Sequence, residues 1–181
     1  MTANAAFDIL TNAEKAAIPP VPPAPLDNWI PIMPVPEDVK RVTPFCKFGK
    51  PSKVWSYNDE EGNLLGGVAR FETVDGKVTL PLSYCEKDGV QQWRWKGFPE
   101  PRPLFQLDAF PAKPLAPVLV VEGEKSAEAA QNMFPDMLVT TSPGGAKAAS
   151  KASWIPLKGR DVSIWPDHDD EGAAYARDVA L

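Results

Sequence analysis

Two apolar runs in this sequence end abruptly in acidic residues. Residues 118–121 are followed directly by Glu122, and residues 162–165 are followed closely by Asp167 and Asp169. Each run has the composition of a buried strand and precedes a helical pattern, so both strands are expected to deliver their carboxylates to one edge of a parallel sheet. Mg²⁺ commonly binds one or two carboxylates together with water and phosphate. The spacing therefore predicts a divalent-metal site and phosphate chemistry.

The three acids have different expected roles. Glu122 is a candidate metal ligand or a group that accepts and donates a proton. The alternative is an acid in the first turn of a helix, for which Glu124 is an equally good candidate. Asp167 and Asp169 are two residues apart, so in extended backbone they would point the same way and share a metal. His168 would then point away, toward solvent or into ordinary packing.

Composition narrows the class of protein. The 181 residues fit one domain or two small ones, and the net charge of −5 argues against coating by nucleic acid while leaving a local basic groove open. Cys46 and Cys85 are far apart and His168 is the sole histidine, so no zinc site is expected. Separate cysteines suit a reducing cytoplasm. Neither a signal peptide nor a membrane-spanning apolar run is present, so a cytoplasmic protein without a membrane partner is expected.

Residues 1–44 carry many of the 21 prolines. Proline fixes φ and removes a backbone donor, so this region is predicted to be a largely extended or disordered arm. The arm is either a spacer or a docking segment for a helicase or another protein partner. The candidate anchors for docking are its apolar residues Trp29, Ile30, Ile32 and Met33.

The rest of the chain predicts an α/β protein in two parts. Residues 45–112 show short apolar runs separated by Asp-Gly turns, typical of a small antiparallel β module. Residues 113–181 alternate strand and helix, typical of a parallel βαβαβα sheet. The predicted strands are 54–57, 64–73, 77–84, 90–96, 117–121, 137–141 and 162–165. The predicted helices are 126–134, 146–153 and 172–181.

Residues 93–96 alternate tryptophan with cations. In a strand, Trp93 and Trp95 occupy one face, and Arg94 and Lys96 occupy the other. One interpretation is a surface that stacks bases and holds phosphates. The other, which we favour, buries both indoles in the β module and leaves the cations in water. The packing partners would then be Trp55, Tyr57 and Phe71.

A second group of cations lies close to the proposed site, at Lys147, Lys151, Lys158 and Arg160. It is either a solvated helix face or a surface that contacts nucleic acid. Its position beside the acids, rather than the number of charges, supports contact with nucleic acid.

The paired segments resemble the Toprim pattern of bacterial and phage DNA primases, topoisomerases and related nucleases. That pattern is a strand ending in Glu-Gly and a strand ending in Asp-x-Asp, often with a glycine three residues later. Here the matching residues are Glu122, Gly123, Asp167, Asp169 and Gly172. Further segments are similar to phage- and plasmid-borne primase–helicase proteins, namely 93–104, 122–127, 142–147 and 157–162. The resemblance covers roughly residues 50–181.

The resemblance implies that the parallel sheet is a partial Toprim domain. Glu122 would be the general acid/base of nucleotidyl transfer or a metal ligand. Asp167 and Asp169 would hold Mg²⁺, for which Mn²⁺ could substitute. Lys125 and Lys147 would contact phosphate in the substrate or template.

The sequence also departs from the family pattern. Ser126 replaces an acid that many members carry four residues after the glutamate. The chain ends at Leu181, inside the third predicted helix, whereas the family fold continues with at least one more strand. The zinc module that often precedes primase Toprim domains is missing. The resemblance therefore implies either a piece of a longer polypeptide or a shortened relative.

Three functions remain open at this stage. The leading hypothesis is a phage or mobile-element replication protein of a bacterial host, a primase that uses Mg²⁺ and nucleotides on a single-stranded DNA template. A Toprim nuclease would share the same metal ligands. The third is a non-catalytic adaptor or inhibitor of a nucleic-acid-processing complex, which Ser126, the net negative charge and the proline-rich arm favour.

Overall fold

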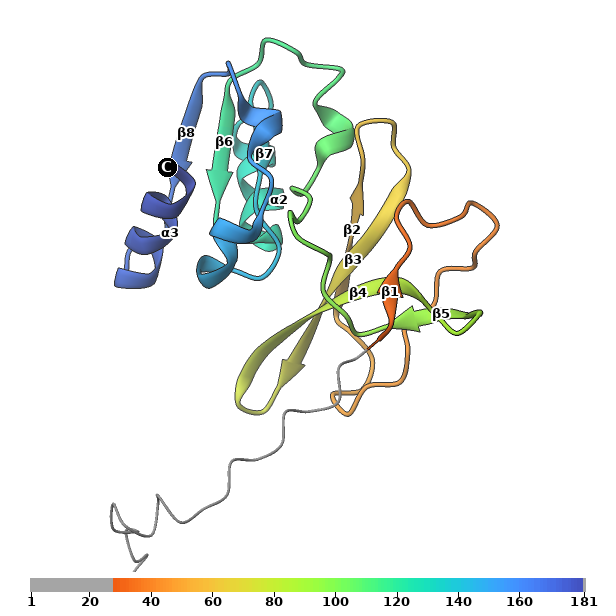
Figure 1. The fold of residues 1–181 in the computed structure, drawn as a ribbon. Coiled ribbons are helices and arrows are strands. Elements are labelled where there is room, and N and C mark those ends of the chain that lie inside the picture. The colour runs from red at the N-terminus through yellow and green to blue at the C-terminus, as the bar shows by residue number, and fades with distance from the viewer. Residues whose placement is uncertain (1–27, 181) are drawn as a thin grey trace, which may run out of the picture.

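A computed structural model describes residues 28–180, except for the side chains of Ala146 and Lys147. It contains one five-stranded antiparallel sheet and one three-stranded parallel sheet (Figure 1). The predicted α/β class is confirmed, with the antiparallel part first in the chain. That the parallel sheet is part of a Toprim domain stays a prediction, and residues 1–27 of the predicted arm lie outside the described residues.

The antiparallel sheet is built from local hairpins. Its strands are β1 (Ile30–Pro31), β2 (Lys53–Asn58), β3 (Leu64–Thr73), β4 (Gly76–Lys87) and β5 (Val90–Arg94), and their order is β1-β4-β3-β2, with β5 also paired to β4. Asp88 and Gly89 have φ of 51° and 79°. Two successive positive φ values match the twist of a two-residue hairpin, as an Asp-Gly turn predicts. The four predicted strands are present, although the last ends at Arg94 rather than residue 96.

Residues 28–44 of the predicted arm pack against this sheet. Pro31 of β1 lies opposite Cys85 of β4. The backbone N–H of Val35 donates to the carbonyl of Leu64 at 2.6 Å, and Val35 is buried. The segment is extended at Ile30–Pro31 and turns at residues 36–39, where the Val39 N–H donates to the Pro36 carbonyl at 3.1 Å. β1 lies at the edge of the sheet, where a strand tolerates missing backbone donors.

The parallel sheet has the order β7-β6-β8. Its strands are β6 (Val118–Val121), β7 (Leu138–Thr140) and β8 (Val162–Trp165), its helices are α2 (Glu124–Met133) and α3 (Asp170–Ala180), and three short 3₁₀ helices are η1 (Leu107–Ala109), η2 (Ala146–Lys151) and η3 (Ile155–Leu157). The helix predicted at 146–153 is therefore the shorter 3₁₀ helix η2. It ends early because backbone bonds with Arg102 hold the chain extended after Lys151: the Arg102 N–H donates to the Lys151 carbonyl at 2.7 Å, and the Ser153 N–H donates to the Arg102 carbonyl at 2.8 Å.

Strand β6 is buried on both faces and joins two cores. Val118 and Val120 pack with Tyr175 of α3, whereas Leu119 and Val121 belong to a cluster with α2. The second cluster also contains residues of the antiparallel sheet: Trp55, Tyr57, Leu65 and Val68. A common core therefore crosses the predicted boundary between 45–112 and 113–181. Within the described residues, no helix is both long and apolar enough for a membrane span.

Candidate active site

Two of the predicted acids meet at the carboxyl edge of the parallel sheet. Val121 of β6 lies opposite Trp165 of β8, so Glu122 and the residues after Trp165 emerge side by side. The Glu122 carboxylate accepts a hydrogen bond from the backbone N–H of Asp167 at 2.8 Å. Glu122 is partly buried and Asp167 is exposed. The parallel register thus places both carboxylates where a ligand in solution can reach them.

Asp169 contacts the following helix. Its Oδ1 accepts the Gly172 N–H at 2.7 Å, so Asp169 caps the N-terminus of α3. A Cβ on Gly172 would lie 2.2 Å from the Asp167 carbonyl oxygen and 2.6 Å from Glu122 Oε1. The glycine is therefore required for the close approach of α3 to both acids, and it has no positive φ.

The carboxyl edge of the parallel sheet with Glu122, Asp167 and Asp169, here called the acid edge, carries concentrated negative charge. The pKa of Glu122 is raised above its ordinary value, first by partial burial and then by the nearby carboxylates of Asp167, Asp169 and Glu171, while the hydrogen bond from the Asp167 N–H lowers it. In the part of the chain that the structure describes, no three His, Cys, Asp or Glu side chains are grouped closely enough to hold a metal ion. Glu122 and Asp167 place two carboxylates side by side, the number with which Mg²⁺ commonly binds, and Oδ2 of Asp169 lies outside its capping bond.

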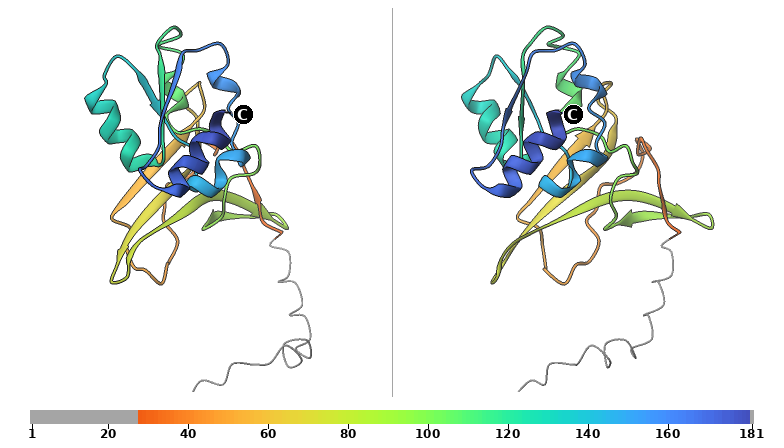
Figure 2. Two further views of the ribbon diagram at one scale, coloured as in Figure 1. Left: turned by 90° about the vertical axis from the view of Figure 1, so that its left-hand side faces the viewer. Right: turned by 60° about the vertical axis from the view of Figure 1, so that its left-hand side comes forward.

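A cavity of about 230 Å³ separates this edge from the antiparallel sheet. On one side it is lined by Glu122, Asp167, the first turn of α2 and the Gly144–Gly145 turn. On the other side, the lining residues are Trp55, Val68, Arg70, Lys77 and Thr79. The β3–β4 hairpin that carries the last three projects beneath the parallel sheet (Figures 1 and 2). The acid edge therefore faces the hairpin across the cavity.

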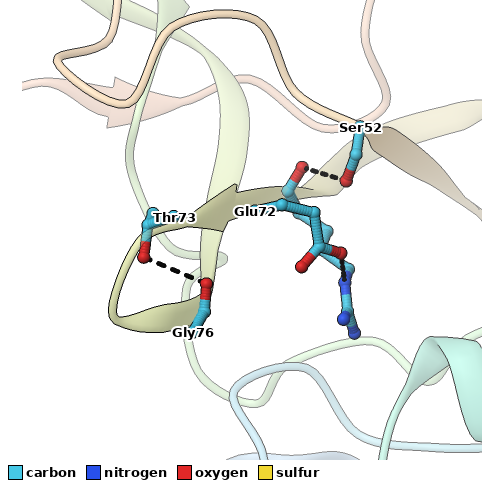
Figure 3. A network of polar contacts seen from close by, with 5 residues as sticks. Ser52, Glu72, Thr73 and Gly76 are labelled. Carbon is cyan, nitrogen blue, oxygen red and sulfur yellow. Dashed lines mark hydrogen bonds and ion pairs between the residues drawn. The ribbon is translucent and has the colours of Figure 1, made fainter.

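The hairpin presents cations to the cavity. Arg70 lies opposite Thr79, and Glu72 lies opposite Lys77. Arg70 Nε donates to Glu72 Oε1 at 2.6 Å, next to the turn that the Thr73 hydroxyl closes on the Gly76 carbonyl at 3.0 Å (Figure 3). The pKa of Glu72 is lowered, first by this bond from Arg70 and also by Lys125 and Lys77. Since Lys125 belongs to α2, cations of both walls act on Glu72, and Arg70, Lys77 and Lys125 all line the cavity.

Three other predicted cations, Arg94, Lys96 and Lys151, do not line this cavity. The fourth, Lys147, has no described side chain. Lys151 Nζ lies 3.1 Å from Glu100 Oε1, and the Arg94 guanidinium lies 4.5 Å from the centre of the Trp29 ring. Lys96 follows β5 in the antiparallel sheet, outside the cavity lining.

Arg70 and Lys77 were not predicted as site residues, although strand alternation predicts which face of the sheet each of them occupies. Ala69 and Phe71 are buried, so strand alternation puts Arg70 on the opposite, polar face. The Asp-Gly turn then places Lys77 on that face as well. What alternation could not show is that this face meets the acid edge.

The two tryptophans of residues 93–96 pack within the protein. Trp93 is buried and donates Nε1–H to the Lys40 carbonyl at 3.0 Å. Trp95 packs edge-on against Phe71, with 5.5 Å between ring centres. Phe71 is thus a partner as predicted, whereas Trp55 and Tyr57 belong to the core shared with the parallel sheet.

Glu124 is the first residue of α2, as its candidacy for a first-turn acid predicted, but its burial beside the site was not predicted. Glu124 is 8% exposed, and its Oε1 accepts the Tyr57 hydroxyl at 2.7 Å. Burial raises the pKa of Glu124 above its usual value, and the bond from Tyr57 opposes this rise. Burial and the neighbouring Glu124 raise the pKa of Tyr57 well above its usual value, so its hydroxyl stays protonated and donates.

This raised pKa predicts a pH-dependent stability. The folded protein holds the Glu124 proton more tightly than the unfolded chain, so the free energy of unfolding falls as pH rises from below the unfolded pKa through the folded one. Glu124→Gln keeps the acceptor oxygen and removes this titration. We expect the variant to melt a few degrees above the parent at neutral pH and to converge with it in acid, as measured by thermal unfolding between pH 4 and 8. A variant that melts below the parent at neutral pH contradicts this account.

No protein-family model and no curated protein matches this chain. Solved structures do match. A chain in the complex of bacteriophage T7 lagging-strand DNA polymerase with primase domains bound to an RNA/DNA hybrid and dTTP is 19% identical, with a TM-score of 0.51, over 71% of this chain and 58% of that one. The primase fragment of the bacteriophage T7 primase-helicase protein is 18% identical, with a TM-score of 0.51, over 70% of this chain and 47% of that one. The E. coli primase catalytic core is 17% identical, with a TM-score of 0.44, over 68% of this chain and 37% of that one.

The chain therefore has a primase-type fold. It spans 58% and 47% of the two T7 chains, so it corresponds to about half of each. At this level of identity the likeness concerns the fold alone, because one fold can carry different functions.

Proposed function

We propose that this protein belongs to a DNA-replication primase that carries out Mg²⁺-dependent nucleotidyl transfer on a single-stranded DNA template. The observation that carries the proposal is the pairing of Glu122 with Asp167 opposite the cations of the β3–β4 hairpin, across one cavity. Nucleotidyl transfer needs both parts, since oxygen ligands hold the metal and cations bind phosphate. The primase-type fold supports the same assignment.

Each residue has a role in this proposal. Glu122 and Asp167 hold the metal, and Asp169 adds its Oδ2 while Oδ1 caps α3. The bound metal supplies positive charge to the reacting phosphate. The raised pKa of Glu122 also suits a group that exchanges a proton with the attacking hydroxyl.

The cations bind phosphate in the same proposal. Arg70 and Lys77 contact the polynucleotide backbone, and Lys125 lies between that backbone and the acids. Lys147, which follows the Gly144–Gly145 turn in the chain, is a further candidate contact to phosphate. The partners are single-stranded DNA, nucleotides and, through the proline-rich segment, a helicase in the cytoplasm of a phage-infected or plasmid-bearing bacterium.

A direct assay decides among the candidate functions. Labelled single-stranded DNA is incubated with the protein and Mg²⁺ or Mn²⁺, with and without nucleotides. New oligonucleotides support the proposal, and shortening of the label indicates a nuclease instead. Neither product, no metal binding by calorimetry and a stable protein partner in a pull-down would identify an adaptor.

The cavity cations predict a salt-dependent binding defect. Lys77→Met and Lys125→Met should each reduce the slope of log affinity against log salt by about 1, because each removes one phosphate contact. The measurement is fluorescence anisotropy of a labelled single strand over a range of salt concentrations. Lys158→Met is the matched control, since Lys158 is exposed and precedes the opposite end of β8. An equal change in all three variants would place binding elsewhere.

A further inference from the structure

The Tyr57–Glu124 bond is a buried polar contact that joins the antiparallel sheet to helix α2 next to the acid edge. Tyr57 on β2 is 0% exposed, and its ring packs on Phe98 and Phe105, at 5.0 and 5.3 Å between ring centres. These contacts hold the hydroxyl in place. Glu124 is the first residue of α2 and comes 67 positions later in the chain. A hydrogen bond at this position therefore fixes the start of α2 on the antiparallel sheet.

The segment that this bond anchors is short: Glu122 follows β6 and accepts the Asp167 N–H at 2.8 Å, and α2 begins two residues later. Only Gly123 separates Glu124 from Glu122, and its φ of 146° is one that side chains rarely adopt. A Cβ built on Gly123 would meet nothing within 4 Å, so no neighbour packs on the outer side of this turn. Glu124 and Glu122 both line the cavity. The Tyr57–Glu124 bond thus links the antiparallel sheet, which carries the hairpin cations, to a point two residues from Glu122.

We propose that Tyr57 and Glu124 are positioning residues for Glu122. Their hydrogen bond clamps the Gly123 turn against β2 and so sets the separation between the acid edge and the β3–β4 hairpin. The geometric part of this inference is independent of the reaction. Its kinetic consequence rests on the proposed function.

A second contact between the same two elements provides the matched control. Lys53 of β2 pairs with Glu128 of α2 at 3.0 Å, with side chains 50% and 39% exposed. This ion pair lies one helical turn further from Glu122. Exposed pairs contribute little, so Lys53→Met should leave the Gly123 turn as it is.

The test uses three variants and two readouts. Tyr57→Phe removes only the donor, Glu124→Gln keeps an acceptor oxygen, and Lys53→Met breaks the exposed pair. Amide hydrogen exchange is measured for Ala127, whose N–H donates to the Gly123 carbonyl at 2.9 Å, and for the following residues of α2. Primer synthesis is measured as kcat and as KM for the template. We expect Tyr57→Phe to speed exchange and lower kcat by roughly tenfold each, with KM nearly unchanged because Arg70 and Lys77 are untouched. Lys53→Met should stay close to the parent in both readouts, and Glu124→Gln should keep the slow exchange of the parent because its amide oxygen still accepts the Tyr57 hydroxyl.

The outcomes separate this inference from the proposed function. Unchanged exchange in Tyr57→Phe, or an equal change in Lys53→Met, overturns the positioning role whatever the activity. A parent protein without Mg²⁺-dependent synthesis overturns the proposed function, and exchange still decides the positioning role. Should Tyr57→Phe fail to fold, Glu124→Met against Glu124→Gln repeats the comparison, with faster exchange expected only in the methionine variant.

Discussion

Glu122→Gln is expected to reduce Mg²⁺-dependent synthesis by on the order of 10³-fold while leaving the fold intact. The amide oxygen can still accept the Asp167 N–H, so the edge of the sheet keeps its hydrogen bond. What is lost is a negatively charged metal ligand. Because the pKa of Glu122 is raised on folding, its charge does not stabilise the fold, and the melting temperature should stay the same or rise slightly.

The companion variant makes this prediction sharper. Asp167→Asn should cause a similar loss, and the double variant should be little worse than either single one, since both residues serve one metal. Activity is measured by primer synthesis at several Mg²⁺ concentrations, and folding by thermal unfolding. Asp178→Asn, an exposed acid of α3, is the control and should be fully active. Synthesis that survives both Glu122→Gln and Asp167→Asn would rule out the assignment.

The fold was predictable wherever local chemistry determines it. β3 and β8 span the residues that the sequence predicts, because apolar alternation and Asp-Gly turns act within a few residues. η2 differs because backbone pairing with Arg102, more than forty residues earlier, ends it. The proline-rich segment likewise follows its own φ preference, while the place where it packs depends on distant strands.

The site was predictable only in part for the same reason. Parallel strands bring their carboxyl ends together, so the meeting of Glu122 and Asp167 follows from the strand pattern. The approach of Arg70 and Lys77 depends on how two sheets pack, which no local pattern encodes. The Tyr57–Glu124 bond spans 67 positions, and a tyrosine in a strand pattern predicts burial without naming a partner.

Gly172 is the position where the smallest change should do the most structural harm. Alanine there would put Cβ 2.2 Å from the Asp167 carbonyl and 2.6 Å from Glu122 Oε1, both fixed by the sheet and the acid pair. Either α3 moves away from the acids, or the Glu122 side chain rotates away from Asp167. We expect a loss of about 1–3 kcal/mol in the free energy of unfolding, although alanine favours a helix interior by about 1 kcal/mol.

The displacement of Glu122 should also disable the site. Metal binding by calorimetry and primer synthesis should both fall in Gly172→Ala, even below its melting temperature. Gly97→Ala is the control, because a Cβ at Gly97 would meet only Pro81, at 3.9 Å, and should change stability by less than about 0.5 kcal/mol. If the two variants melt and bind alike, α3 does not depend on close approach to the acids, and the glycine of the motif has no role in positioning Glu122.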